Sequence, residues 1–393
     1  MSIDKKWIIF FGEDWGRHHS TGQYLAKELA KNYRVLWINS LGMRAPKLNI
    51  RDISRIFHKL FDFAGSLFKK RVRVNSQHPD ENGIEVLAPL AIPLLSFRVV
   101  RWFNRAFVLR LIKGAMLRLD ISRPIVITSC PASVDLIDRL ESDIKVYYCA
   151  DEHSEIHGMD RELVCSLEQE LLGKVDVVVA SAKMLVETKS KRHKSVHYLP
   201  HGVDYQLFRK AVHDKHSLPK DIADIKTPII GFVGLIGEHI DMAIISYLSD
   251  EFKDSSIVMV GPVEEGYEVV HASNIVYTGE KERTELPRYL AHFSACILPY
   301  KQTERNKFAN PTKINEYLAA GCPVITVPHP EINADATGIY VAETVESFAD
   351  SIRAAFQTSV EEKRVISNSM ETSTWQHRAQ RLLEIIDTGS TLS

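Results

Sequence analysis

Short apolar runs rich in β-branched residues alternate with amphipathic stretches along nearly the whole chain. In the first half these runs predict strands at Trp7–Phe11, Arg34–Asn39, Ile84–Leu87, Ile125–Ser129, Val146–Cys149, Val175–Ala180 and Val196–Leu199. In the second half they predict strands at Ile229–Val233, Ile257–Val260, Ile275–Thr278, Ala295–Pro299, Val324–Val327 and Ile339–Val341. Helical periodicity fills most of the intervals, as in Gln23–Lys31 and Arg161–Leu172. Continuous apolar strands separated by helices are typical of parallel sheets that are covered on both faces.

About thirteen such strands exceed one comfortable sheet, so the pattern predicts an α/β chain with two Rossmann-like doubly wound domains that face each other across a cleft. We place an N-terminal domain at 1–205, a polar linker at 206–227, a C-terminal domain at 228–370 and a last helix at 371–393 that packs back toward the N-terminal domain. In such sheets ligands bind beyond the carboxyl ends of the strands, where the strand order reverses. The residues that directly follow each strand are therefore the candidates for chemistry.

Composition adds little to this picture. The 393 residues are 45% hydrophobic and 25% charged, which is ordinary for a globular protein. The first apolar run, Trp7–Phe11, is too short for the core of a signal peptide, and no stretch is long enough to cross a membrane. Five cysteines at wide spacing, without a C-x-x-C pair, are typical of free thiols in a reducing compartment. These features predict a cytoplasmic protein.

Charge is divided unevenly between the two parts of the chain. Residues 1–120 hold 21 lysines and arginines against 10 acidic residues, whereas the remainder holds 28 against 40. Two stretches, 51–73 and 93–118, combine basic residues with large apolar side chains at helical spacing. This pattern is typical of helices in the interface of an anionic membrane, and we predict a peripheral position there. Ordinary surface helices whose apolar side chains face the core are the alternative. Nucleic acid is not an expected partner, because no recognisable module is present.

One short helix carries the strongest chemical signal. The sequence NPTKINEYLAAGCPV predicts a helix over Pro311–Ala320, with Asn310 as its N-cap and Gly321 directly after its end. Lys313 and Glu316 are three residues apart and share a face. Because a helix N-terminus attracts phosphate, this helix can bind a nucleoside diphosphate, with the lysine at the phosphates and the carboxylate at the ribose hydroxyls. A surface ion pair on a capped helix is the alternative, and helix physics alone does not separate the two.

This stretch and its surroundings resemble the GT-B glycosyltransferases. The resemblance rests on NPTKINEYLAAGCPVI, on NIVYTGEKERTELPRYLAHFSACILPYKQ upstream, and on LPHGVDYQLF at the predicted domain join. The chain is similar to the glycosyl transferases of group 1 and to branches that build bacterial exopolysaccharide, including the glucuronosyltransferase type of xanthan assembly. The resemblance implies transfer of a sugar from a nucleotide-sugar donor.

The resemblance also assigns donor binding to residues of the second half. Glu316 would hold the donor ribose, and the turn at Pro311–Lys313 would meet the diphosphate. The loop Val276–Glu280 would meet the base through backbone groups, and Gly234 would let the backbone approach the phosphates. The donor-binding residues implied in this way are Gly234, Tyr277, Thr278, Gly279, Asn310, Pro311, Thr312, Lys313 and Glu316.

Two positions depart from the pattern of the relatives. Phe308 stands where many relatives carry a Glu that supports the donor sugar. The segment LIGEHID stands where many carry an Arg and a Lys. Lys313 then remains as the main catalytic cation that neutralises the leaving diphosphate.

The acceptor is expected to bind in the first half. Asp151 and Glu152 directly follow a strand, and a carboxylate at this place can take a proton from a hydroxyl group. By similarity to the glucuronosyltransferase branch, Asp151 is the predicted base, with Glu152 in reserve; capping of the next helix is the alternative role for Asp151. The loop after the first strand adds further acceptor candidates, which are Asp14, Arg17, His18 and His19. A tight loop capped by Ser20 or Thr21 explains that segment equally well.

These inferences predict a metal-independent hexosyl- or hexuronosyltransferase. It would move a sugar from a UDP-sugar to a lipid-linked or polysaccharide acceptor in cell-surface glycan biosynthesis, on the inner face of the membrane. No D-x-D motif is present, so no metal or other cofactor is expected beyond the nucleotide-sugar. A UDP-sugar isomerase or epimerase on the same fold and a non-catalytic nucleotide-sugar-binding partner are the alternatives. A nicotinamide-dependent oxidoreductase is disfavoured, because FFGEDWG lacks the G-x-G-x-x-G spacing.

Overall fold

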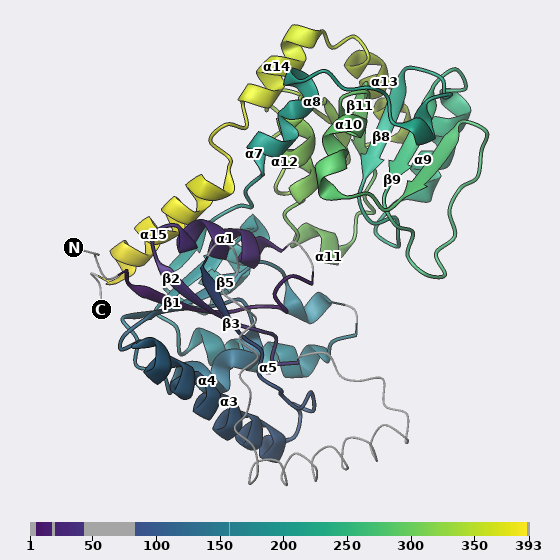
Figure 1. Cartoon of the computed structure of the whole chain (residues 1–393). Coiled ribbons are helices and arrows are strands. Elements are labelled where there is room, and N and C mark those ends of the chain that lie inside the picture. The colour runs from purple at the N-terminus through teal and green to yellow at the C-terminus, as the bar shows by residue number, and fades with distance from the viewer. Residues whose placement is uncertain (1–4, 18–19, 43–82, 157, 391–393) are drawn as a thin grey trace. The chain divides into compact units, whose positions relative to one another are not determined.

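The computed structural model describes residues 5–17, 20–42, 83–156 and 158–390 (Figure 1). The chain divides into two compact units: unit 1 is Met1–Leu199 together with Ala379–Ser393, and unit 2 is Pro200–Arg378. Each unit contains one parallel sheet, which confirms the predicted α/β class with two doubly wound sheets.

Within the described residues, unit 1 is built on seven parallel strands in the order β3-β2-β1-β4-β5-β6-β7. The strands are β1 (Trp7–Phe11), β2 (Arg34–Ile38), β3 (Ile84–Leu87), β4 (Ile125–Thr128), β5 (Ile144–Cys149), β6 (Val177–Ala180) and β7 (Val196–Tyr198). Central strands such as β4 and β6 are buried along their whole length, with the sequences IVIT and VVVA. Burial on both faces explains why these strands form unbroken apolar runs.

Helices cover both faces of this sheet. Figure 1 shows α1 and α15 on one face and α3, α4 and α5 on the other, in agreement with the reversal of strand order between β1 and β4. The α-helices are α1 (Thr21–Ala30), α3 (Arg98–Leu119), α4 (Val134–Ile137), α5 (Arg161–Leu172), α6 (Lys183–Ser190) and α15 (Trp375–Ser390), and the 3-10 helices are η1 (Pro131–Ser133) and η2 (His153–Glu155). Ser20, one of the two predicted caps, accepts a hydrogen bond from the backbone N–H of Gln23 at 3.3 Å and so begins α1.

Unit 2 contains six parallel strands in the order β10-β9-β8-β11-β12-β13 within the described residues. They are β8 (Ile229–Val233), β9 (Ser256–Val260), β10 (Ile275–Gly279), β11 (Ala295–Leu298), β12 (Val324–Thr326) and β13 (Ile339–Val341). Phe293 packs directly on the backbone of β8: a Cβ added to Gly231 would lie 1.9 Å from its ring. The glycine in this strand is therefore required by packing.

Helices lie on both faces of the second sheet as well. α9 and α13 pack against each other on one face, and α12 contacts α7 and α14 on the other (Figure 1). The α-helices are α7 (Tyr205–Phe208), α8 (Lys210–His213), α9 (Met242–Glu251), α10 (Leu286–Leu290), α11 (Glu304–Lys307), α12 (Thr312–Ala319), α13 (Val345–Ala355) and α14 (Val360–Asn368), and the 3-10 helices are η3 (Lys220–Ile222) and η4 (Arg283–Glu285).

The stretch 206–227 differs from the predicted linker. It contains α8, η3 and most of α7, and its apolar residues Phe208, Ala211 and Ile222 are buried in the core of unit 2. The boundary between the units accordingly falls between Leu199 and Pro200. The prediction missed this because the three buried anchors are spaced too widely among polar residues to give a periodic signal.

The two basic stretches have different outcomes. Residues 51–73 lie outside the described residues, whereas most of 93–118 forms α3. Among the helices of the described residues, none is both long enough and apolar enough to cross a membrane.

Candidate functional site

Each sheet has one point at which its strand order reverses. This point lies between β8 and β11 in unit 2, and between β1 and β4 in unit 1. Loops that leave the carboxyl ends of such neighbouring strands diverge to opposite faces and open a crevice for a ligand. Gly234 and Lys313 lie together at the first of these points, and Asp14, Arg17 and Asp151 line a pocket at the second.

α12 begins one residue later than predicted. Its N-cap is Pro311, whose backbone is extended, and not Asn310. The side-chain amide of Asn310 instead donates to the Glu331 carboxylate at 3.4 Å. At its other end α12 stops at Ala319, one residue before the predicted end, with Ala320 as its C-cap. Gly321 follows with a φ of 75°, and its N–H donates to the Leu318 carbonyl at 2.8 Å.

A buried tyrosine fixes α12 to the end of β8. The hydroxyl oxygen of Tyr317 accepts a hydrogen bond from the backbone N–H of Val233 at 2.7 Å, and its O–H donates to the Val233 carbonyl at 3.2 Å. Ile314 and Leu318 bury their side chains in the core of unit 2, as predicted. The helix is thus held with its N-terminal turns at the strand ends.

Glu316 is the centre of a buried ion cluster on this helix. It is 6% exposed, and its carboxylate accepts hydrogen bonds from Lys313 Nζ at 2.8 Å and from Arg283 Nη1 at 2.7 Å. Burial alone would raise the pKa of Glu316, but the two cations outweigh burial and lower this pKa. The ion pair with Lys313 is therefore present, yet it is not a solvated surface pair, because the carboxylate is buried.

Arg283 was not among the predicted residues. It begins η4, just after β10, and its guanidinium also lies 4.9 Å above the ring of Phe208. It supplies a second cation to Glu316 beside Lys313. The rule that favours residues just after a strand would have found it, since it lies four residues beyond Gly279.

A glycine lies at or directly after the carboxyl end of each of the three neighbouring strands β8, β9 and β10 of unit 2. Gly234 follows β8, Gly261 follows β9, and Gly279 ends β10. A Cβ on Gly261 would lie 1.9 Å from the carbonyl oxygen of Gly234, so a side chain does not fit there. The Cε of Lys313 is 3.7 Å from the Cβ position of Gly234. The structure thus brings Gly234, Lys313 and Glu316 together at the end of β8.

The remaining predicted donor residues lie at the end of β10 and the start of α12. Thr312 is the first residue of α12, and Gly279 is exposed at the sheet edge. The hydroxyl of Tyr277 donates to the Val270 carbonyl at 2.8 Å, and burial raises the pKa of Tyr277 to about 12. The side chain of Tyr277 is therefore engaged by the protein, and its backbone is what it can offer a ligand.

In unit 1 a pocket of about 530 Å³ opens where the strand order reverses. Asp14, Arg17 and Asp151, all predicted acceptor-site residues, line it together with Glu13 and His153. Arg17 Nη1 lies 3.8 Å from a carboxylate oxygen of Asp14, which makes them an ion pair. The predicted residues His18 and His19 lie outside the described residues.

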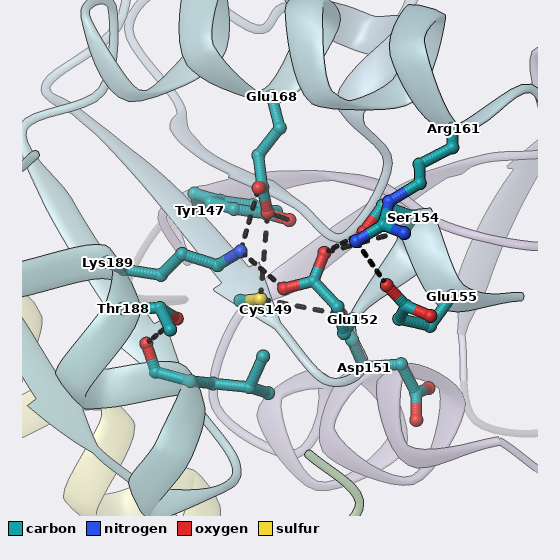
Figure 2. Close-up of polar contacts among 11 residues, drawn as sticks. Tyr147, Cys149, Asp151, Glu152, Ser154, Glu155, Arg161, Glu168, Thr188 and Lys189 are labelled. Carbon is teal, nitrogen blue, oxygen red and sulfur yellow. Dashed lines mark hydrogen bonds and ion pairs between the residues drawn. The ribbon is translucent and has the colours of Figure 1, made fainter. Parts of the chain in front are cut away.

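Glu152 does not line this pocket and instead belongs to a second buried ion cluster (Figure 2). Lys189, which is 4% exposed, donates to the carboxylates of Glu152 at 2.9 Å and Glu168 at 2.7 Å. Burial raises the pKa of Glu152, but Lys189 outweighs burial and lowers it. Glu152 also accepts from the backbone N–H of Ser154 and so caps η2. Because Glu152 does not line the pocket and its carboxylate is directed to Lys189, the structure does not support its predicted acceptor-binding role.

The side chain of Asp151 points away from that of Glu152, its neighbour in the sequence (Figure 2). Asp151 instead lines the pocket of unit 1. The capping role considered for Asp151 belongs to Glu152. Among the described residues, no group of three or more His, Cys, Asp or Glu side chains is arranged to hold a metal ion.

Comparison with known proteins supports this picture. Residues 227–358 match the family described as glycosyl transferases group 1. A stretch of 196 residues is 28% identical to a protein of Bacillus subtilis (strain 168) that carries the name teichuronic acid biosynthesis glycosyltransferase TuaH. This match covers 47% of the chain and 48% of TuaH, so it spans about half of the relative.

Solved structures match over nearly the whole chain. HepE of Anabaena, in complex with UDP and glucose, has a TM-score of 0.64 at 12% identity and covers 98% of this chain and 99% of its own. A glycosyltransferase from Rickettsia africae has a TM-score of 0.67 at 12% identity, with coverage of 99% and 100%. An E. coli trehalose-6-phosphate protein, bound with UDP-2-fluoro glucose, has a TM-score of 0.63 at 11% identity, with coverage of 98% and 99%. At these identities the likeness shows the fold.

The two parallel sheets and these neighbours define a GT-B fold, which confirms the fold expected from the sequence. The match of residues 227–358 to the glycosyl transferases group 1 family and the partial match to TuaH make the chain a distant relative of these glycosyltransferases.

Proposed function

We propose that this chain is a glycosyltransferase that takes a sugar from a UDP-sugar donor. The observation that carries the proposal is the cluster of Glu316, Lys313 and Arg283 beside Gly234, at the switch point of the sheet and within the family-matched residues. A buried ionised carboxylate suits two ribose hydroxyls, and a cation beside a helix N-terminus suits a diphosphate. The complexes of HepE with UDP and of the E. coli protein with a UDP-sugar analogue support UDP as the nucleotide.

Each donor residue has a distinct task in this proposal. The ribose hydroxyls donate to Glu316, whose carboxylate has lone pairs beyond the two that the cations use. Lys313 turns its ammonium group to the diphosphate, together with the backbone N–H groups of the first turn of α12, while Arg283 stays on Glu316 and keeps it ionised. The loop at Gly279 binds the base through its backbone. As the bond from the anomeric carbon to the diphosphate breaks, Lys313 and the helix N-terminus stabilise the developing charge.

The acceptor is assigned to the pocket of unit 1. Asp14 and Arg17 offer hydrogen bonds to its hydroxyl groups, and a carboxylate of the pocket, for which the sequence favoured Asp151, takes the proton of the attacking hydroxyl. The name of TuaH supports an acceptor in cell-surface polymer synthesis, either lipid-linked or polysaccharide. The transferred sugar is a hexose or a hexuronic acid.

A lipid-linked acceptor is consistent with the outer face of α3, which we propose binds an anionic membrane. Val99, Trp102 and Leu117 are 77%, 60% and 86% exposed, and they share this face with exposed basic residues. The exposed basic residues of α3 are Arg98, Arg110, Lys113 and Arg118. Large apolar and cationic side chains on one helix face fit an interface with acidic lipid headgroups.

Arg101 does not belong to that face, although it lies in the basic stretch. Its guanidinium donates to Asp135 at 2.8 Å and to Glu170 at 2.9 Å, and its side chain is 19% exposed. Arg101 therefore holds α3 against α4 and α5 and is not available to lipid.

Thermal unfolding with UDP, GDP, ADP and NAD tests the donor proposal. UDP should raise the melting temperature of the wild type by mass action. At a UDP concentration of 100 times Kd, binding adds about 2.7 kcal/mol to the free energy of unfolding. Glu316→Gln should lose most of this shift, and Glu361→Gln, an exposed residue of α14, should keep it. Equal UDP shifts in Glu316→Gln and the wild type would refute the site. UDP release that requires a lipid or glycan acceptor supports transfer, whereas conversion of the UDP-sugar alone supports an isomerase.

A further inference from the structure

The proposal above leaves Glu13 without a task. Glu13 is the first side chain after β1, since Gly12 has none, and it lines the pocket of unit 1. Asp14 follows it, and Asp151 enters from the loop after β5, so three carboxylates line the pocket at the point where the strand order reverses. The other titratable side chains in the described lining are Arg17, Cys130 and His153.

The backbone at Glu13 is fixed by the sheet. A Cβ on Gly12 would lie 2.2 Å from the ring of Trp37, so Gly12 passes directly against this buried indole. The indole N–H of Trp37 donates to the carbonyl of Glu13 at 2.9 Å, and the N–H of Gly12 donates to the carbonyl of Ile38 at 3.0 Å. These contacts hold the Glu13 main chain in place at the end of β1. A group placed by a rigid element is well suited to act on a bound ligand.

The carboxylate of Glu13 is available to a ligand. Within the described residues no ion pair or hydrogen bond engages it, and Arg17 pairs with Asp14 instead. Although the side chain is exposed, burial against the pocket wall is the largest influence on it, followed by the negative charges of Asp151 and then Asp14. Together they raise the pKa of Glu13 to about 7. A general base works best when its pKa lies near the working pH, so a pKa of about 7 suits proton transfer at neutral pH.

His153 provides a second, independent sign that the pocket is built for a polar ligand. Both of its ring nitrogens are buried, and neither has a hydrogen-bond partner among the described residues. Leaving buried polar atoms without partners costs free energy. A ligand rich in hydroxyl groups supplies both donors and acceptors, so it can satisfy the imidazole and a carboxylate in the same pocket.

We propose that Glu13, rather than Asp151, binds the attacking hydroxyl group of the acceptor and takes its proton. The inference rests on the proposed transferase function and names the group that acts in the acceptor pocket. The hydroxyl donates to the Glu13 carboxylate, and its oxygen bonds to the anomeric carbon of the donor. The bond from that carbon to the diphosphate breaks, its electron pair leaves with UDP, and the hydroxyl proton passes to Glu13. Asp151 is a positioning residue whose charge keeps Glu13 basic.

The first test is carboxyl ¹³C NMR of the full-length protein labelled at its glutamate side chains. The resonance that is absent from Glu13→Gln should titrate near pH 7. In Asp151→Asn the same resonance should titrate at lower pH, because the neighbouring negative charge has been removed. A Glu13 resonance that titrates below pH 5 in the wild type, or that does not respond to Asp151→Asn, would overturn the proposal.

The second test is UDP release as a function of pH, from UDP-glucose and from UDP-glucuronic acid, with water or a bacterial glycolipid extract as acceptor. Glu13→Gln should release UDP about 100-fold more slowly, as expected when a proton acceptor is lost, with an unchanged KM for the donor. Asp151→Asn should move the acid limb of the rate profile to lower pH. Glu187→Gln, on the exposed face of α6, is the matched control and should behave as the wild type.

The outcomes separate this inference from the proposed function. Absence of UDP release from the wild type with both donors and all acceptors would overturn the transferase proposal and this inference with it. Normal release by Glu13→Gln, combined with loss at every pH in Asp151→Asn, would overturn the inference alone and return the role to Asp151. Glu13→Asp, which keeps the carboxylate, should recover part of the rate, and recovery would exclude a loss of folding as the cause.

Discussion

Glu316 remains ionised although it is buried, because two cations share its carboxylate. A lowered pKa stabilises the folded protein above the pKa of the unfolded chain, near 4.5, and this contribution is lost as the pH falls through the folded value. Lys313 belongs to the same helix as Glu316, whereas Arg283 comes from the loop after β10. The pair with Arg283 therefore ties two segments together and stabilises the tertiary structure more than the local pair does.

Replacing Arg283 by Met should destabilise the fold and change how its stability depends on pH. We expect the free energy of unfolding at pH 7 to fall by roughly 1–3 kcal/mol, because a hydrogen bond to a buried charge is lost. The acid-induced loss of stability should begin at higher pH than in the wild type, since the pKa of Glu316 rises. Urea unfolding between pH 4 and 7 measures both effects. Arg364→Met, which removes an exposed partner of Glu361, is the control, and a similar loss there would contradict the argument.

The raised pKa of Glu13 should give protein stability the opposite dependence on pH from that caused by Glu316. The folded pKa of Glu13, about 7, lies above the ordinary glutamate value of 4.5, so its contribution to stability is fully present below pH 4.5 and is lost as the pH rises through 7. Glu13→Gln should therefore be more stable than the wild type at pH 8, by about 1 kcal/mol after solvent screening at this exposed side chain. The gain should vanish near pH 4.5. Thermal unfolding at the two pH values measures it, and a difference that does not change with pH would exclude the shifted pKa.

At the scale of the elements, short apolar runs located the strands well. β1 and β8 have the predicted bounds and are buried at nearly every position, as expected for a parallel strand that is covered on both faces. β3 and β13 also have the predicted bounds, although they lie at the edges of their sheets and are only partly buried. The end of α12 was predicted to within one residue, because Gly321 adopts a positive φ that other residues avoid. The start of α12 was missed by one residue, because the Asn310 side chain binds Glu331 in preference to the helix N-terminus.

The candidate sites were predictable only in part. Lys313 and Glu316 lie on one turn of a helix, so their spacing in the sequence showed that they meet. Arg283 meets Glu316 across 33 residues, and Glu13 meets Asp151 through the loops of β1 and β5, which are separated in the sheet by β4. Such encounters depend on strand order and loop path, which hydrophobic periodicity does not encode. Glu152 shows the converse, since only the fold reveals Lys189 beside it.

Helix α3 carries the membrane prediction. Replacing Arg110 and Lys113 together by Gln should weaken sedimentation with phosphatidylglycerol vesicles at least about 10-fold, since each basic residue near such a surface contributes about 1 kcal/mol. Trp102→Ser should weaken it as well, by loss of apolar contact. Arg123→Gln, an exposed residue outside α3 that pairs with Asp143, is the control. Binding that survives both sets of substitutions would assign the contact to another part of the chain.

For the whole molecule, the proposals divide the reaction between two sheets that each have their own switch point. Donor binding is assigned to unit 2, and acceptor binding is assigned to the pocket of unit 1. Substitutions in the two units should then change different quantities. Glu316→Gln should raise the Kd of UDP by 10-fold or more, whereas Glu13→Gln and Asp14→Asn should leave that Kd within twofold of the wild type and lower the rate of UDP release.

Calorimetric titration with UDP and a turnover assay on the same preparations measure the two quantities side by side. Far-UV circular dichroism of each variant ensures that the folded protein is compared. We expect this pattern because, within the described part of the chain, the Glu316 cluster consists of residues of unit 2 alone, whereas the pocket is lined by residues of unit 1 alone. If Glu13→Gln and Asp14→Asn weakened UDP binding as strongly as Glu316→Gln does, the pocket of unit 1 would be part of the nucleotide site, and the assignment of donor and acceptor to separate units would be wrong.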